Sequence, residues 1–283
     1  IFLNYVSSPF SSLFHIPRLL FNRYDRIFLY QLSPVYMSIA GIILGKITRT
    51  KTIMYILDIW PENLYSVLPI KNRFARRFLA SSSHWYYRHT DKIVVLSEKM
   101  KTKLQKISNK NDKDIIVIPQ AAEKIYETPI NDQPLAKRFG DKFTILFTGN
   151  LSPAQSFTTI IDAAELISQR GHTNIHWVVV GDGMSKKEIQ KSIHSKGLGD
   201  YFTFEGQKPI NDIPKYTALA DVLVGCLVKS DLLEATIPAK VMSYIASGKP
   251  IVLAMDGEVQ DLISTTIRCG LVGNTEDSAT LAD

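Results

Sequence analysis

The sequence predicts an α/β protein with two domains, each built around a parallel β-sheet. Short apolar runs alternate with helical patterns along the whole chain, which is typical of βα units. A polar stretch at residues 123–142, with two prolines and few large apolar residues, divides this alternation into two series. With 283 residues, of which 45% are hydrophobic, the chain is long enough for two cores. We therefore expect domains at residues 1–142 and 143–283.

The first series contains four expected strands separated by helical patterns. These strands are the apolar runs at residues 27–32, 53–57, 92–96 and 115–118. The run at residues 35–44 follows the capping pair Ser33-Pro34 and is too short to span a bilayer, so it predicts a buried helix.

Residues 71–90 form a basic segment with aromatic side chains and no acidic residue. We expect the aromatic side chains to pack on a core, and we interpret the charge as a surface for an anionic membrane. The aromatic residues are Phe74, Phe78, Trp85 and Tyr86.

The second series is more regular and predicts an open, doubly wound sheet. Such a sheet binds its ligand beyond the carboxyl ends of its strands, usually where the strand order reverses. The expected strands are residues 143–148, 176–180, 201–204, 222–226 and 251–254, and the expected helices are residues 156–169, 185–196 and 211–219, with a further helix starting near Pro238.

The charge of the chain is divided between its two halves. Residues 1–142 hold 22 Lys and Arg against 11 Asp and Glu, whereas residues 143–283 hold 11 against 16, so the net charges are +11 and −5. This asymmetry indicates an anionic partner for the first half. The two cysteines, Cys226 and Cys269, lie among apolar residues and predict core thiols in a reducing compartment.

The segment 236–254 places a lysine where a helix would attract an anion. Pro238 suits the first position of a helix, and Gly248 and Pro250 end it within about three turns. Lys240 would lie in the first turn, where the helix dipole disfavours a cation unless an anion also binds there. A bound phosphate or a solvated surface lysine explains Lys240 equally well.

Two glycine loops follow expected strands of the second series. Gly149-Asn150 follows the first strand, and Gly181-Asp182-Gly183 follows the second. Glycines permit a tight turn and a close approach of the backbone to a ligand. The second loop lacks a third glycine in phase, so it is no dinucleotide fingerprint and also fits a plain strand-to-helix turn. Together the loops outline one cleft.

Two carboxylates are candidates for chemistry. Asp58 follows an expected strand, where it would orient a sugar hydroxyl or handle a proton, although Asp is also a common turn residue. Glu234 precedes the Pro238 helix and would reach a ligand there, or be an exposed loop acid. The histidine spacings make no metal site, and we expect no metal, no cofactor and no nucleic-acid partner.

Four segments, taken in order and spacing, resemble the carboxyl-terminal domain of family-4 glycosyltransferases. They are TGNLSPAQSFTTIIDA, VVVGDGMSKKEI, FTFEGQKPINDIPKYTALADVLV and IPAKVMSYIASGKPIV. LDIWPENL followed by KIVVLSEKM resembles the amino-terminal domain of the branch that builds bacterial surface polysaccharides. The similarity covers nearly the whole chain.

This resemblance implies a GT-B fold, with two Rossmann-like domains facing each other across a cleft, and transfer of a sugar from a nucleotide donor with retention of configuration. By position, residues 149–155 would lie under the donor diphosphate and residues 181–183 near the nucleotide. The segment with Gln207 and Lys208 would pass by the base, and residues 234–240 would hold the ribose, sugar and phosphates. The catalytic candidates are Asp58, Glu234 and Lys240, and the substrate-binding candidates are Gly149, Asn150, Gln155, Gly181, Asp182, Gly183, Gln207, Lys208 and Pro238.

Several positions depart from the family pattern. Asn150 and Gln155 stand where the wider family commonly has an Arg and a Lys on the diphosphate, so Lys240 would supply that charge. Ser243 replaces the second of two glutamates spaced eight apart, and Glu234 is one position out of register with the first. Family members also usually extend beyond both ends of this chain, so the resemblance implies a first domain that is incomplete at its start.

These observations predict a cytoplasmic glycosyltransferase, peripheral on the inner face of the cell membrane. The acidic second half would bind a nucleotide sugar, most simply a UDP-sugar, and the basic first half would meet the membrane and a lipid-diphosphate-linked or polysaccharide acceptor. Two alternatives remain open: a nucleotide-sugar epimerase on the same fold, and a non-catalytic GT-B subunit that binds nucleotide sugar.

Overall fold

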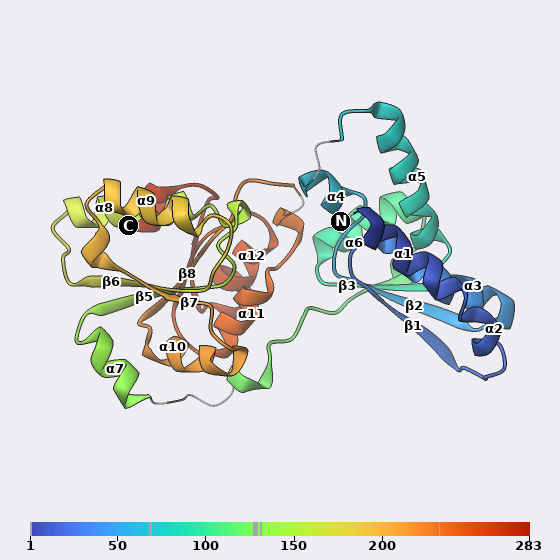
Figure 1. Cartoon of the computed structure of the whole chain (residues 1–283), viewed down its shortest axis with the longest axis horizontal. Coiled ribbons are helices and arrows are strands. Elements are labelled where there is room, and N and C mark those ends of the chain that lie inside the picture. Colours follow the sequence, from blue (N-terminus) through green and yellow to red (C-terminus); the bar gives the residue numbers. More distant parts are fainter. Residues whose placement is uncertain (1, 68–69, 127–129, 131, 232) are drawn as a thin grey trace. The chain divides into compact units, whose positions relative to one another are not determined.

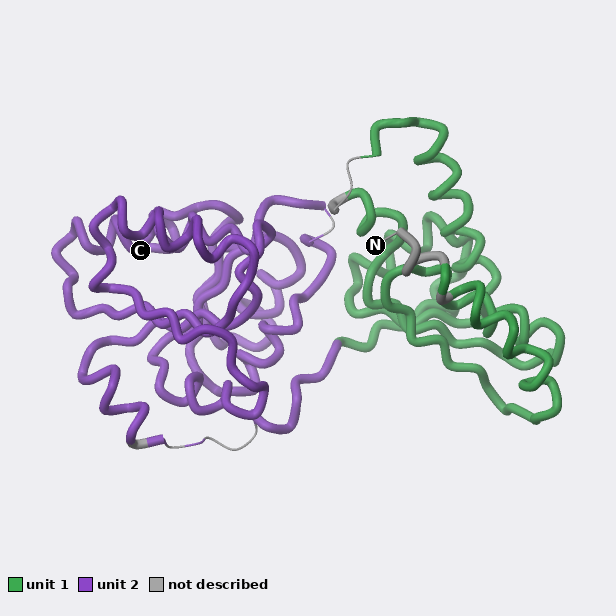
Figure 2. Tube along the Cα trace, viewed as in Figure 1, with its two compact units in different colours: residues 1–119 green, residues 120–283 purple. Residues whose placement is uncertain are grey.

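The computed structural model describes residues 2–67, 70–126, 130, 132–231 and 233–283. The chain divides into two compact units, residues 1–119 and 120–283 (Figure 2). Each unit contains one parallel β-sheet with helices packed on it (Figure 1). The two sheets confirm the predicted pair of Rossmann-like α/β units.

The first unit contains a four-stranded parallel sheet in the order β1-β2-β3-β4. Its elements are α1 (Phe2–Leu13), α2 (Ile16–Leu19), β1 (Arg26–Gln31), the 3₁₀ turn η1 (Val35–Ser38), α3 (Ile39–Thr48), β2 (Lys51–Ile56), α4 (Glu62–Val67), α5 (Arg73–Arg88), β3 (Lys92–Val95), α6 (Glu98–Ser108), the 3₁₀ turn η2 (Asp112–Asp114) and β4 (Ile115–Val117). The four strands lie within two residues of their predicted bounds, and residues 35–44 fall in η1 and α3, as expected.

Strands β1 and β2 of the first sheet are buried on alternate residues, whereas β3 is buried on three consecutive residues. On β1, Leu29 and Gln31 are buried, whereas Phe28 and Tyr30 are exposed. Because consecutive parallel strands are joined by right-handed crossovers, the connecting helices gather on one face of such a sheet. Tyr30 stacks on Tyr55 of β2 at 5.8 Å between ring centroids, so aromatic side chains line the other face.

The basic helix α5 only partly matches its prediction. Its second half is anchored as expected, because Tyr86 and Tyr87 are buried. Phe74 and Phe78, however, are 86% and 73% exposed, so the expectation that they pack on a core is wrong. They lie in the first half of α5, one helical turn apart and beside Arg73 and neighbouring arginines. No helix in the described part of the chain is both long enough and apolar enough to cross a membrane.

The second unit contains a six-stranded parallel sheet in the order β10-β9-β8-β5-β6-β7. Its helices and strands are α7 (Gln133–Phe139), β5 (Phe143–Thr148), α8 (Phe157–Gln169), β6 (Ile175–Val180), α9 (Lys186–Ser195), β7 (Phe202–Gly206), α10 (Ile213–Leu219), β8 (Val222–Cys226), α11 (Ala239–Ala246), β9 (Ile251–Ala254), α12 (Glu258–Gln260), β10 (Gly270–Gly273) and α13 (Ser278–Ala282). The shorter turns are η3 (Lys124–Tyr126), η4 (Pro153–Gln155), η5 (Gly199–Tyr201), η6 (Ile210–Asp212), η7 (Leu233–Ala235) and the π-helical turn η8 (Asp261–Ile267).

This order is that of a doubly wound sheet, and β5 is where it reverses. The chain builds β5, β6 and β7 in one direction and then returns to add β8 on the other side of β5. Both faces of the sheet are covered: Ile145 and Phe147 belong to the core under α8 and α9, whereas Leu146 belongs to the core under α10 and α11. In a sheet of this order we expect a ligand to bind beyond the carboxyl ends of β5 and β8.

The segment 123–142, which the sequence predicts as the connection between domains, lies in the second unit. The division between the units falls at residues 119 and 120, whereas the sequence places it at 142 and 143. Helix α7, inside this segment, is capped by Asp132, whose carboxylate accepts a hydrogen bond from Leu135 N at 3.0 Å. Leu135 and Phe139 of α7 are buried in the core of the second unit. Two apolar residues in a polar segment were too weak a pattern to predict this helix.

Candidate nucleotide-sugar site

A cavity of about 440 Å³ lies at the carboxyl ends of β5, β6 and β7 in the second unit. Seven residues that the sequence assigns to substrate binding line it together with Val180 and Ile213. They are Gly149, Asn150, Gly181, Asp182, Gly183, Gln207 and Lys208. The structure therefore brings three loops, which are far apart in the sequence, to one place.

Glycine is required where the first two loops meet. Gly181 has a positive φ of 149°, and a Cβ atom there would lie 1.8 Å from the carbonyl oxygen of Gly149. A Cβ atom on Gly183 would lie 2.3 Å from the carbonyl oxygen of Leu151. Gly149 N donates to Val180 O at 2.9 Å, and Leu151 N donates to Asp182 O at 2.9 Å. These contacts fix the loops against each other and hold their backbone at the wall of the cavity.

Asp182 and Lys208, both predicted as ligands, are each held by a neighbouring charge. Asp182 accepts hydrogen bonds from Lys186 Nζ at 2.7 Å and from Gly183 N at 2.8 Å, which lower the pKa of its carboxyl group. Lys208 Nζ lies 3.3 Å from Glu205, whose side chain is only 4% exposed. Each of these two side chains therefore lies beside an opposite charge, and Lys208 shares its carboxylate partner with Arg138.

Glu205 is the centre of a polar cluster beside the cavity. Its carboxylate accepts hydrogen bonds from Arg138 Nη2 at 2.5 Å and from Tyr216 OH at 3.0 Å, in addition to the ion pair with Lys208. Burial raises the pKa of Glu205, but the bonds from Tyr216, Arg138 and Lys208 outweigh it, and the pKa is lowered. Glu205 is not among the residues predicted from the sequence, although an acidic residue near the end of an apolar strand was a usable signal.

Lys240 has a different environment. It lies in the first turn of α11, as predicted, and its ammonium group donates to Gln155 Oε1 and sits 4.0 Å from the centroid of the Phe147 ring. Within the described residues no carboxylate pairs with it. A Cβ atom on Gly149 would lie 3.0 Å from Lys240 Nζ, so the ammonium group lies against the backbone of a cavity-lining residue.

The position of Lys240 combines a positive charge with little solvent. Removal of its ammonium group from bulk water lowers the pKa of Lys240 to about 7. The neighbouring Cys226 thiol is also buried, which raises its pKa to about 12, so it supplies no negative charge at neutral pH. An ammonium group with an amide and an aromatic ring as partners would be stabilised by an anion. A doubly wound sheet binds its ligand beyond the carboxyl ends of its strands, where the strand order reverses, which here is at β5 and β8.

Three further residues complete this end of the site. Pro238 is the N-cap of α11, whereas the sequence predicts it as the first helical residue. Gln155 accepts a hydrogen bond from Lys240. Ser243, on the next turn of α11, donates a hydrogen bond to Glu123 Oε2 at 3.2 Å. A carboxylate therefore lies at the position where the family pattern has its second glutamate, but it comes from residue 123.

Neither of the two predicted carboxylates is among the residues that line this cavity. Glu234 lies in η7, where its backbone packs on Gly257, and the described residues provide no hydrogen bond to its side chain. Asp58 lies in the first unit, at the carboxyl end of β2, where it accepts a hydrogen bond from Ser33 Oγ at 3.1 Å. Among the described residues no group of three or more His, Cys, Asp or Glu is arranged to hold a metal ion.

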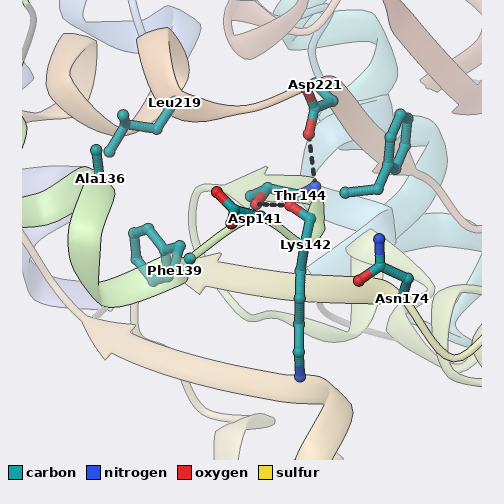
Figure 3. Close-up of a pocket in the computed structure, with 10 residues that line it drawn as sticks. Ala136, Phe139, Asp141, Lys142, Thr144, Asn174, Leu219 and Asp221 are labelled. Atoms are coloured by element: carbon teal, nitrogen blue, oxygen red, sulfur yellow. Dashed lines mark hydrogen bonds between the residues drawn. The ribbon is translucent and has the colours of Figure 1, made fainter.

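A second cavity, of about 450 Å³, lies at the amino ends of the strands of the same sheet (Figure 3). Its lining includes residues that begin strands, and Asp221 accepts a hydrogen bond there from Thr144 N at 2.7 Å. Parallel sheets of this kind bind ligands beyond the carboxyl ends of their strands and not at the amino ends. The cavity at Gly149 and Gly181 is therefore the better candidate for a substrate.

Two Rossmann-like units, the second with a cavity at the carboxyl ends of its strands, are typical of the GT-B class of fold, and a solved structure supports this assignment. HepE of Anabaena, solved in complex with UDP, superposes with a TM-score of 0.73 at 17% identity, covering 94% of this chain and 70% of HepE. HepE has also been solved with UDP-glucose. The model of the family described as Glycosyl transferases group 1 matches residues 142–283, half of the chain. The chain belongs to this family.

The curated relatives that match this chain are longer than it is. The chain is 25% identical over 224 residues to 2-deoxystreptamine glucosyltransferase of Streptomyces kanamyceticus, an alignment that covers 72% of this chain and 58% of the relative. It is 24% identical over 148 residues to the GDP-mannose-dependent alpha-(1-6)-phosphatidylinositol monomannoside mannosyltransferase of Mycobacterium tuberculosis, covering 52% of this chain and 38% of that protein. The chain thus spans less than two thirds of these relatives.

Proposed function

We propose that this chain acts as a retaining glycosyltransferase that moves a sugar from a nucleotide donor to a lipid-linked or polysaccharide acceptor. The observation that carries the proposal is Lys240, a cation at the carboxyl end of the second sheet with which no carboxylate of the described residues pairs. The donor would extend from the cavity at residues 149–150, 181–183 and 207–208, which would take the nucleoside, to Lys240, which would take the diphosphate.

Lys240 would act mainly through electrostatics. When the bond between sugar and diphosphate breaks, negative charge develops on the departing diphosphate, and a preorganised cation stabilises that charge. A hydrogen bond to a charged group contributes about 1.5–3 kcal/mol, which is about 10- to 100-fold in affinity or rate. Gln155 and Pro238 would orient Lys240, while Glu234 would contact the sugar or ribose.

We propose UDP as the nucleotide of the donor. HepE, the structural neighbour with a TM-score of 0.73, was solved with UDP, which supports this choice. The mycobacterial relative is named for GDP-mannose, so the nucleotide differs among relatives.

The first unit would contact an anionic membrane and the acceptor. Residues 1–119 hold 18 Lys and Arg against 7 Asp and Glu, and Phe74 and Phe78 are exposed among the arginines of α5. Aromatic side chains flanked by basic residues favour the interface of an anionic bilayer. This chain would thus be peripheral on the cytoplasmic face of the membrane.

Membrane binding is tested by sedimentation with phosphatidylglycerol vesicles. The wild-type protein should sediment with the vesicles, whereas a Phe74→Ser/Phe78→Ser double variant should remain in the supernatant.

Donor binding is tested by thermal unfolding with nucleotides. A ligand at about 100 times its Kd stabilises by about 2.7 kcal/mol, so UDP should raise Tm measurably and uridine should raise it less. A lack of any shift with UDP or GDP species would contradict the donor site.

Catalysis is tested by transfer of radiolabelled sugar from UDP-sugars into membrane lipid. Lys240→Ala and Glu234→Ala should both reduce transfer, Lys240→Ala by about 10- to 100-fold. Full activity in both variants would refute the assignment. UDP-sugar binding without turnover would instead favour a non-catalytic subunit, and release of epimerised sugar without membranes would favour an epimerase.

A further inference from the structure

Ser33 is the centre of a hydrogen-bond network at the carboxyl end of β1 in the first unit. Its hydroxyl group donates to Asp58 Oδ2 at 3.1 Å. The same oxygen accepts from the indole Nε1 of Trp60 at 2.8 Å and from Asn63 Nδ2 at 3.1 Å. Since β1 and β2 pair in parallel, with Gln31 opposite Ile56, the residues just beyond the two strands are brought together.

The chemistry of these groups determines the direction of the hydrogen bonds. An indole N–H is a donor only, and so is an amide NH₂ group, whereas a hydroxyl group has one proton and two lone pairs. The two N–H donors therefore occupy both lone pairs of Ser33 Oγ. Its single proton is left for the carboxylate of Asp58, so the Ser33 hydroxyl group has one orientation.

The loop that carries Asp58 is fixed from the other side by a buried tyrosine. Tyr87 of α5 is fully buried, and its hydroxyl oxygen accepts a hydrogen bond from Trp60 N at 2.8 Å. The same hydroxyl group donates to Trp60 O at 3.3 Å. Trp60 itself is 2% exposed. The loop thus has a rigid support, which is what a binding group needs to keep its geometry.

Asp58 is half-buried and uses one of its two oxygens. Ser33 occupies Oδ2, and within the described residues Oδ1 accepts no hydrogen bond. A carboxylate oxygen beyond the end of a parallel strand, with its partner oxygen fixed, can accept a hydrogen bond from a ligand hydroxyl group.

We propose that Ser33 is a positioning residue that orients the Asp58 carboxylate, so that Oδ1 binds a hydroxyl group of a polyhydroxylated acceptor. This inference rests on the proposed function, because it takes the ligand of the first unit to be the acceptor. It adds Ser33, with Trp60 and Asn63 behind it, to the residues on which acceptor binding depends.

The test uses octyl β-D-glucopyranoside, below its micelle concentration, as a sugar with an apolar tail. Its binding is measured by ligand-observed NMR with UDP present at saturation. Wild-type protein should bind it saturably, and Ser33→Ala should weaken binding about tenfold, the effect of losing one oriented charged hydrogen bond. Ser33→Thr keeps the hydroxyl group and should stay within about twofold. Ser82→Ala is the matched control, because Ser82 Oγ bonds Tyr36 OH at 2.8 Å and not Asp58.

A double variant separates positioning from general stability. If Ser33 acts through Asp58, Ser33→Ala/Asp58→Asn should bind the glucoside no more weakly than Asp58→Asn alone. Additive losses, an unaffected Ser33→Ala variant, or no binding by the wild type would overturn the proposal. If Ser33→Ala does not fold, Asn63→Ala, which removes one donor to Ser33, should still weaken binding about threefold, and unchanged binding would overturn the proposal. Every folded variant should keep the UDP-induced rise in Tm, whereas failure of the proposed function would remove that rise from the wild type.

Discussion

Lys208 and Lys240 lie at two ends of the candidate donor site, and their surroundings differ in one decisive respect. Lys208 is paired with the buried carboxylate of Glu205. Lys240 has a neutral amide and an aromatic ring as partners, and burial lowers its pKa to about 7. The charge of Lys208 is directed to a protein carboxylate, whereas the charge of Lys240 is available for a ligand. Among the described residues no carboxylate pairs with Lys240, and this difference from Lys208 supports the proposal that a donor diphosphate binds at Lys240.

The largest expected effect comes from reversing the charge of Lys240. Lys240→Glu should weaken UDP binding by more than about 100-fold, because it places a carboxylate where the diphosphate would lie. Lys208→Gln should weaken UDP binding by less than about fivefold, since the ammonium group of Lys208 is directed to Glu205. Isothermal titration with UDP measures both. Equal losses in the two variants would break the contrast between the lysines.

The second expected effect is a dependence of UDP affinity on pH. With a pKa of about 7, Lys240 is mostly neutral in the free protein at higher pH, and a bound diphosphate favours its charged form. UDP binding should therefore take up a proton above pH 7, and affinity should fall by up to about tenfold per pH unit between pH 7 and 9. Titrations in buffers of different ionisation enthalpy measure this uptake. Lys240→Arg does not titrate in this range and should show a flat profile.

The third effect concerns Glu205, the carboxylate partner of Lys208. Glu205→Gln removes the charge that holds Arg138, Tyr216 and Lys208, and should lower the free energy of unfolding by about 1–3 kcal/mol while changing UDP affinity by less than about threefold. The lowered pKa of Glu205 means that its contribution is present at neutral pH and is lost as pH falls through that pKa. Urea unfolding at pH 7 and pH 3 should therefore show a smaller difference at pH 3. Glu165→Gln, at the more exposed ion pair with Lys196, is the control.

The smallest effect is a gain in stability when Lys240 is replaced. Its pKa is lower in the folded state than in the unfolded chain, so the unfolded state binds more protons between pH 7 and about 10.5, and stability rises with pH across that window. Below pH 7 the whole cost of burying the ammonium group is present. Lys240→Met should remove this cost and raise Tm of the ligand-free protein at pH 7 by about 2–4 °C per kcal/mol gained. An unchanged or lower Tm would show that burial of the Lys240 ammonium group does not destabilise the protein.

Most of the second unit could be predicted from the sequence, because its strands are continuous apolar runs bounded by glycine, proline or aspartate. Strands β5, β8 and β9 have the bounds that the sequence predicts, and the loops after β5, β6 and β7 meet in one cavity. Lys240 could be singled out because a cation in the first turn of a helix is locally unfavourable. This reasoning uses only neighbours in the sequence.

The remaining features depend on contacts between distant segments. Helix α7 owes its place to burial of Leu135 and Phe139 against strands that come later in the chain. Lys240 has Gln155 as its amide partner, 85 positions away in the sequence. Lys208 has Glu205 as its carboxylate partner, and no sequence pattern marks that pair. Ser33 could be interpreted only as part of a capping pair, because its bonds to Asp58 and Trp60 form when β1 and β2 pair.

The most direct test of the account is the ratio of the dissociation constants of uridine and UDP at pH 6.5, where Lys240 is mostly charged. For the wild type we expect UDP to bind about 10- to 100-fold more tightly than uridine, because only UDP carries the diphosphate. Lys240→Ala should bring this ratio close to one and leave the affinity for uridine unchanged. If Lys240→Ala keeps the wild-type ratio, the diphosphate binds elsewhere and the account is contradicted.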